Sequence, residues 1–168
     1  MTTEGASVPS VATSDRPRRS RTRTARLGLA AGAAALAAAD LAARSLAEQH
    51  LAGRTVDLGV VDLRLGYNSG AAFSLGAGLP SWVVIAVAGL ITAGVAVFAW
   101  RAATDASWPL MVGLSAVLAG AAGNLVDRSG DGLVTDYLHT GWWPTFNLAD
   151  VFITLGAATV AFAALRAE

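Results

Sequence analysis

Four apolar segments, each close to the length that crosses a bilayer, constrain this chain more than any other feature of its sequence. A helix needs about 20 predominantly apolar residues to span the hydrocarbon of a membrane. Hydrophobic residues make up 54% of the chain and charged residues only 14%, whereas a soluble domain carries about 25% charge. The sequence therefore predicts an all-α membrane bundle of four transmembrane helices. The predicted spans are residues 27–47, 81–100, 108–126 and 148–165.

A cluster of arginines before the first span sets the expected orientation. Its members are Arg16, Arg18, Arg19, Arg21, Arg23 and Arg26. The positive-inside rule places such a cluster in the cytoplasm, and its position beside a span favours a membrane anchor over nucleic-acid binding. Both chain ends are then cytoplasmic, and the loops at about 48–80 and 128–146 are extracytoplasmic. We expect residues 1–26 to form a disordered basic tail and residues 27–166 to form the membrane domain. A cleavable signal peptide is the alternative for the first segment.

The first extracytoplasmic loop alternates apolar and polar residues, as a half-buried strand does. Val56, Leu58 and Val60 follow this two-residue period, and the alternation changes phase directly after Val60. The phase change predicts a bulge or a short bend between two strand pieces. Residues 133–138 of the second extracytoplasmic loop predict a further strand. We therefore expect a small extracytoplasmic β-rich cradle.

Asp127 and Asp150 each lie at the edge of a predicted span. Ionisable groups in membrane helices are costly and typically functional. Two neighbouring helices of opposite direction, joined outside the membrane, bring these carboxylates to the same depth. Each aspartate also follows an asparagine, Asn124 or Asn147, by about one helical turn, and an Asn side chain can donate to a carboxylate or bind a peptide backbone. We therefore predict that Asp127 and Asp150 form a catalytic pair.

Such a pair has the chemistry of an acid and a base. Two carboxylates in a partly dry site do not both ionise readily, so the pair retains a proton near neutrality. The ionised member can remove a proton from an attacking water, and the protonated member can supply the leaving amine of a peptide. Taken singly, either aspartate is also compatible with an ordinary helix end, where the helix dipole favours Asp150.

The sequence offers few residues for other kinds of catalytic or metal site. The chain has no Cys and no Lys, which excludes a thiol nucleophile, a Cys-based metal site and a Ser/Lys dyad. A Ser/His arrangement would need His139 of an external loop to meet a serine such as Ser115 in the third span. No His-Glu-x-x-His pair is present for zinc, although an aspartate-only metal site stays open. The main alternative from another class is a small transporter or proton pathway, but the middles of the second and fourth spans are almost wholly apolar.

Three further features accompany the predicted pair. Asp40 and Arg44 lie four residues apart in the first span, a spacing that favours an ion pair within the helix, with a supporting role at the site as the alternative. Asp136 lies in the predicted strand after Gly132, where we expect its carboxylate to bond nearby backbone. Residues 68–74 begin with turn-forming residues and lead toward the second span.

Together these motifs resemble the lipoprotein signal peptidase family, or signal peptidase II, of bacterial membranes. The matching motifs, in the family's order, are Asp40 with a basic residue four positions later, Asn-Ser-Gly-Ala-Ala-Phe-Ser at 68–74, Gly-Asn-Leu-Val-Asp-Arg at 123–128, Gly-Leu-Val-Thr-Asp-Tyr at 132–137, and Phe-Asn-Leu-Ala-Asp at 146–150. There are mild departures. Arg44 stands where the family usually has Lys, Ala119 with Gly120 stands where a Gly-Gly pair is common, and Thr135 and Tyr137 replace the commoner Val and Phe.

The resemblance implies a membrane aspartic endopeptidase without a metal or organic cofactor, whose partners are lipid-modified prolipoproteins and membrane lipids. It implies removal of the signal peptide from diacylglyceryl-modified prolipoproteins by a cut on the amino side of the lipidated cysteine. The enzyme would lie in the bacterial cytoplasmic membrane with its active site near the outer face. The implied residues are Asp127 and Asp150 as catalytic, Asn68, Asn124, Arg128 and Asn147 as substrate-positioning, and Asp40, Arg44 and Asp136 as supporting.

Overall fold

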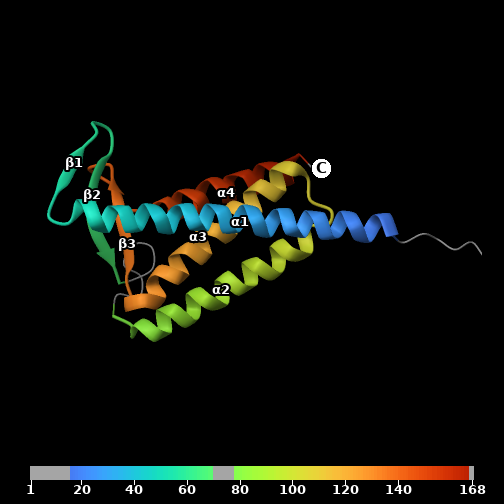
Figure 1. The fold of residues 1–168 in the computed structure, drawn as a ribbon, viewed down its shortest axis with the longest axis horizontal. Coiled ribbons are helices and arrows are strands. Elements are labelled where there is room, and N and C mark those ends of the chain that lie inside the picture. Colours follow the sequence, from blue (N-terminus) through green and yellow to red (C-terminus); the bar gives the residue numbers. More distant parts are fainter. Residues whose placement is uncertain (1–15, 70–77, 167–168) are drawn as a thin grey trace, which may run out of the picture.

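The computed structural model describes residues 16–69 and 78–166, and this part of the chain forms four helices and three strands. The helices are α1 (Arg16–Leu51), α2 (Ser81–Ala102), α3 (Trp108–Asp131) and α4 (Leu148–Leu165). All four are long and apolar enough to cross a membrane. Figure 1 shows them bundled together, with the sheet at one end of the bundle and both ends of the described chain at the other. The predicted four-helix membrane fold is confirmed, and the chain is a multi-pass membrane protein.

Helix α1 is longer than the predicted first span. It begins at Arg16, so the prediction of a disordered tail through residue 26 is wrong for residues 16–26. Once a helix is nucleated, each further residue adds a hydrogen bond at little cost, and a stable apolar span can extend its helix into a polar segment. Figure 1 shows this end of α1 reaching past the other helices. Residues 1–15 lie outside the described residues.

The sheet is antiparallel, in the order β1 (Thr55–Asp57), β2 (Asp62–Asn68) and β3 (Val134–His139). The bend predicted near Val60 is confirmed, because β1 and β2 are joined there by a turn in which Gly59 has a φ of 90°. A positive φ of this kind favours glycine. The irregularity in register lies elsewhere, between Leu63 and Gly66 where β2 pairs with β3.

A small apolar cluster joins the sheet to the bundle. Ala47 and Leu51, at the end of α1, are buried with Tyr137 of β3. Neighbouring residues of a strand point to opposite faces. Asp136 therefore points away from this cluster, toward the other side of β3.

Helices α3 and α4 approach closely through glycines. A Cβ at Gly113 would lie 2.9 Å from the backbone oxygen of Gly156, and one at Gly120 would come still closer to the oxygen of Ala149. Small residues at such positions let two helix backbones pack tightly in a membrane. The first turn of α4 is thereby brought against the second half of α3.

Candidate active site

The first turn of α4 is held by side chains from its own N-cap and from α1. The Asn147 Oδ1 accepts the backbone N–H of Asp150 at 3.0 Å, and the Asp150 Oδ2 accepts the N–H of Asn147 at 3.3 Å. From α1, the Asp40 Oδ1 accepts the N–H of Ala149 at 2.9 Å. The first N–H groups of a helix have no partner within it, so these acceptors satisfy them. Asp150 is therefore fixed in place as part of a capping box.

Asp127, at the end of α3, has a different set of partners. Its Oδ2 accepts from Arg44 Nη1 at 2.6 Å and from the backbone N–H of Thr135 at 2.6 Å. The ion pair predicted between Asp40 and Arg44 is confirmed, with Arg44 Nε 2.8 Å from the Asp40 Oδ2. Asp40 and Arg44 are 0% and 2% exposed. Asp127 thus binds α1 and β3 together through its contacts with Arg44 and Thr135.

Asp136 of β3 is buried beside the start of α4, with 4% of its surface exposed. Its Oδ1 accepts from the Asn147 Nδ2 at 2.6 Å, and the side chain of Asn68 is a further hydrogen-bond partner. Burial raises the pKa of the Asp136 carboxyl to about 6, and the charge of Asp150 also raises it, whereas the bond from Asn147 and the charge of Arg44 lower it. Asp136 therefore keeps its proton at higher pH than an ordinary aspartate, and it responds to the charge of Asp150.

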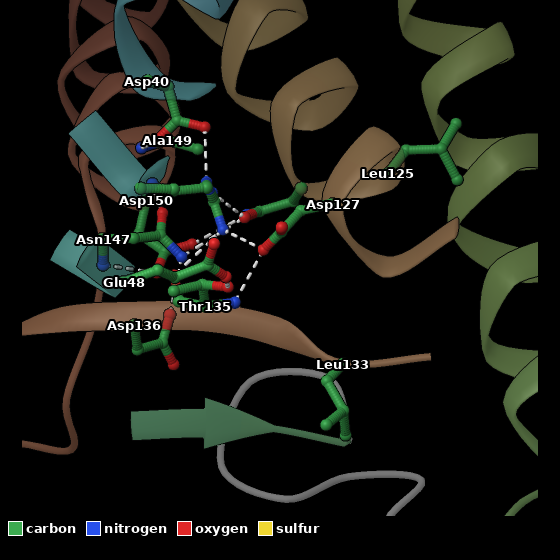
Figure 2. Close-up of polar contacts among 12 residues, drawn as sticks. Asp40, Glu48, Leu125, Asp127, Leu133, Thr135, Asp136, Asn147, Ala149 and Asp150 are labelled. Carbon is green, nitrogen blue, oxygen red and sulfur yellow. Dashed lines mark hydrogen bonds and ion pairs between the residues drawn. The ribbon is translucent and has the colours of Figure 1, made fainter. Parts of the chain in front are cut away.

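Asn124 links these groups across the two helices. Its Oδ1 accepts from Arg44 Nη2 at 2.7 Å and from the Asn147 Nδ2 at 3.3 Å, and its Nδ2 donates to the Asp150 Oδ1 at 2.9 Å. The sequence associated each asparagine with the aspartate one turn after it. The structure instead directs Asn124 to Asp150 of the neighbouring helix, while Asn147 reaches both Asp150 and Asp136. Figure 2 shows Asp127, Asp136, Asn147 and Asp150 converging from α3, β3 and α4.

The remaining predicted residues lie around the same cluster or apart from it. Arg128 is buried, and its charge interacts with those of Asp136, Asp127 and Asp150. Asn68 is the last residue of β2, and most of the 68–74 motif falls in residues 70–77, outside the described residues.

The two members of the alternative Ser/His arrangement have separate partners. His139 lies beside Arg64, 3.1 Å from its Nη2, and Ser115 donates to the backbone oxygen of Leu29 at 3.4 Å. Within residues 16–69 and 78–166, no group of three or more His, Cys, Asp or Glu side chains is placed to hold a metal ion.

A groove of about 380 Å³ opens beside Asp150. It is lined by Thr140, Trp142, Trp143, Phe146, Asp150, Val151, Thr154 and Leu155. Most of these side chains are apolar or aromatic, and Asp150 is the only carboxylate among them. The groove can therefore take an apolar chain and hold it against one of the acids.

Sequence reasoning treated Asp136 as a sheet carboxylate, and the structure gives it a more central position. A signal for this was present, because Asp136 lies among the apolar residues of a short strand, Val134 and Tyr137 included. A carboxylate buried in such a strand is costly unless other groups bind it. The strand itself did not indicate that Asn147 of the following helix supplies the bond.

A sequence model of the signal peptidase II family matches residues 32–166. The chain belongs to the signal peptidase II family. All of the helices and strands described above beyond the first turns of α1 fall within the match, so the predicted resemblance is confirmed.

Relatives with this family name match part of the chain. The lipoprotein signal peptidase of Rhodococcus jostii is 44% identical over 104 residues, which are 58% of this chain and 50% of the relative. That of Syntrophomonas wolfei is 42% identical over 89 residues, 53% of this chain and 58% of the relative. The chain therefore spans about half the length of the curated relatives that it matches.

Solved structures show the same fold as this signal peptidase II family member. Two structures, each described as a bacterial membrane enzyme, superpose with TM-scores of 0.68 and 0.69 at 22% sequence identity. They cover 82% and 83% of this chain, and 87% and 94% of their own chains. The similarity extends over nearly the whole of both folds.

Proposed function

We propose that this chain is an aspartic endopeptidase that removes the signal peptide from diacylglyceryl-modified prolipoproteins, cutting on the amino side of the lipidated cysteine. The observation that carries the proposal is the burial of Asp136, with a pKa of about 6, where it responds to the charge of Asp150. The relatives named lipoprotein signal peptidase support the substrate class.

The acid pair in this proposal is Asp136 with Asp150, and Asp127 becomes a supporting residue. Both oxygen contacts found for Asp127 go to groups that hold the fold, Arg44 and the backbone of Thr135, and both use the same oxygen at 2.6 Å. Asp136 and Asp150 differ in environment, and they interact electrostatically. Two carboxylates held in different environments can divide the roles of acid and base.

The chemistry follows from this division. Asp150, acting as the base, takes a proton from a water as the water oxygen bonds to the carbonyl carbon of the scissile peptide, and Asp136 gives its proton to the carbonyl oxygen. The resulting gem-diol then collapses. The proton on Asp150 moves to the leaving nitrogen, the C–N bond breaks, and one hydroxyl returns its proton to Asp136. Both acids end in the protonation states in which they began.

The membrane supplies substrate binding and orientation. The apolar groove beside Asp150 suits a lipid or an apolar peptide segment, and burial of an acyl chain contributes about 0.8 kcal/mol per CH₂. Both ends of the described chain lie at the end of the bundle away from the sheet (Figure 1), and α1 begins there with its arginines. The positive-inside rule makes that end cytoplasmic. The acid pair then lies near the outer face of the bacterial cytoplasmic membrane.

The test uses the purified full chain in detergent with two matched substrate peptides, one carrying the diacylglyceryl group and one without it. Mass spectrometry should find a single cut before the modified cysteine, in the lipidated peptide only. We expect Asp136→Asn and Asp150→Asn to lose at least about 10³-fold in turnover, and Asp127→Asn to keep measurable activity because its role is structural. An inactive Asp127→Asn beside a working Asp136→Asn would return the assignment to Asp127. Equal cleavage of both peptides would refute the substrate class.

A further inference from the structure

The guanidinium of Arg44 contacts groups from three elements at once. Its Nη1 donates to the Asp127 Oδ2 at 2.6 Å and to the backbone oxygen of Thr135 at 3.0 Å, and its Nη2 donates to the Asn124 Oδ1 at 2.7 Å. Its Nε donates to the Asp40 Oδ2 at 2.8 Å. Every nitrogen of this 2% exposed side chain therefore has a defined acceptor.

On one side, these contacts fix the strand that carries Asp136. Arg44 binds the oxygen of Thr135, and Asp127, itself bound by Arg44, accepts the N–H of Thr135 at 2.6 Å. Both backbone polar groups of the residue directly before Asp136 are thus held by the Arg44–Asp127 pair. This places the backbone from which the Asp136 side chain extends.

On the other side, the contacts fix the partner of Asp150. Because the Asn124 Oδ1 accepts from Arg44 at 2.7 Å, its amide nitrogen points the other way, where it donates to the Asp150 Oδ1 at 2.9 Å. Arg44 thereby makes the shorter of the two contacts that hold the Asn124 oxygen away from the acid, the other being from Asn147 at 3.3 Å. Without the bond from Arg44, the Asn124 Oδ1 keeps only the longer 3.3 Å contact from the Asn147 Nδ2, and the amide is held less firmly toward Asp150.

We propose, building on the proposed function, that Arg44 is a positioning residue that sets the placement of Asp136 relative to Asp150, acting through Thr135 and Asn124. The planar guanidinium is required because its N–H donors are carried on three nitrogens with fixed relative directions. A lysine ammonium carries the same charge on one nitrogen and cannot reach all four acceptors in this geometry. Arg44→Lys is therefore not a conservative change in this chain, although the signal peptidase II family usually has Lys at this position.

The test compares Arg44→Lys, Arg44→Gln and Asn124→Ala by kcat, KM and the pH profile of kcat/KM on the lipidated peptide. We expect Arg44→Lys to lose about 100-fold in kcat, the scale of a 1 Å misplacement, with KM changed by less than about threefold and the pH profile unmoved. With Asp136 as the acid, kcat/KM should fall as pH rises through its pKa, and Arg44→Gln should move this fall to higher pH, because the charge of Arg44 lowers the pKa of Asp136. The matched control is Arg64→Lys, a change at an exposed arginine of β2 that should leave kcat unchanged.

A double-mutant cycle tests the route through Asn124. If Arg44 acts through this amide, Arg44→Lys combined with Asn124→Ala should lose clearly less than the product of the two single losses. Should Arg44→Gln fail to fold, Arg44→Lys and the cycle still decide the matter.

Two results would overturn the proposal: an Arg44→Lys enzyme with normal kcat, or losses in the cycle that multiply. A failure of the proposed function looks different, because the wild type would then cleave neither peptide or both equally, and retained turnover in Asp136→Asn or Asp150→Asn would refute the acid pair. Inactive aspartate variants beside a normal Arg44→Lys enzyme would refute the positioning role alone.

Discussion

The side-chain amide of Asn147 donates to the Asp136 carboxylate across 2.6 Å, and this bond joins the strand that carries one acid to the helix that carries the other. Asn147 is 0% exposed, and its Oδ1 at the same time caps the N–H of Asp150. One buried side chain therefore contacts both members of the proposed pair. The amide is polarised between an acceptor on one side and a donor on the other, so neither of its ends can rotate without losing a bond.

Asn147→Ala should remove both contacts. We expect kcat to fall about 100-fold from the lost placement of Asp136 relative to Asp150. The free energy of unfolding should fall by about 1–3 kcal/mol, because a helix cap is lost and a buried carboxylate loses a donor. Peptide cleavage and thermal unfolding in detergent measure these two effects. Ser107→Ala is the control, since Ser107 caps α3 without a side-chain hydrogen bond and its removal should be nearly neutral. Unchanged turnover in Asn147→Ala would contradict the role given to this bond.

The activity should decline as pH rises through the titration of Asp136. With Asp136 as the acid, the active form carries its proton, so kcat/KM of the free enzyme should fall above an apparent pKa near 6. The measured value belongs to the pair, because the two carboxyls interact. In Asn147→Ala the limb should move to higher pH, since the bond from Asn147 lowers the pKa of Asp136. A limb that moves to lower pH, or no limb between pH 5 and 8, would count against Asp136 as the acid.

The stability of the fold should also depend on the proton of Asp136. The pKa of Asp136 is raised in the folded protein from 3.8 to about 6, so the folded state holds this proton more tightly than the unfolded chain. The contribution is fully present below about pH 4 and is lost as pH rises to about 6. The melting temperature of the wild type should therefore fall between about pH 4 and pH 6 relative to that of Asp136→Asn, because the variant has no carboxyl proton at this position. Parallel curves for the two proteins would contradict the raised pKa.

The fold was predictable because its main signals are local. Apolar runs of membrane length marked all four helices, and α4 begins and ends at the residues that its run predicted, Leu148 and Leu165. The phase change at Val60 located the turn between β1 and β2. The composition of residues 16–26 indicates only how this segment would behave in isolation, where it would be disordered. In the structure these residues are helical because the helix of the adjoining span continues into them.

The site was predictable as a set of residues and less so as a set of contacts. Asp127, Asp150 and their asparagines were identified from spacing along single helices. The pairing of Asn124 with Asp150, and of Asn147 with Asp136, depends on how α3, α4 and β3 pack, and no periodicity within one element encodes it. The preference for Asp136 over Asp127 as the partner of Asp150 follows from burial and from the Arg44 contact, which only the assembled fold provides.

The close approach of α3 and α4 should be sensitive to one methyl group. In Gly120→Ala, the new Cβ would collide with the backbone oxygen of Ala149 and with the side chain of Ile153. Backbone cannot move aside as a flexible side chain can, so we expect a loss of about 1–3 kcal/mol in the free energy of unfolding, together with reduced turnover. Gly94→Ala on α2 is the matched control, because a Cβ there meets nothing within 4 Å. Equal melting temperatures for the two variants would show that the helices are not in contact at Gly120.

The groove beside Asp150 should select for the lipid part of the substrate. Thr154 lies in its wall, exposed and one turn beyond Asp150 on the same helix, so Thr154→Trp should fill it without disturbing the core. Excluding even two CH₂ groups of an acyl chain from this surface weakens binding by about 1.6 kcal/mol, so KM for the lipidated peptide should rise on the order of tenfold while kcat changes little. Ala158→Trp, one turn further along the exposed face and outside the groove, is the control and should leave KM unchanged. If both tryptophans raise KM equally, the effect is a general property of this helix face and the lipid does not bind in the groove. If kcat falls while KM holds, the groove carries the peptide near the acids, and the acyl chains lie elsewhere.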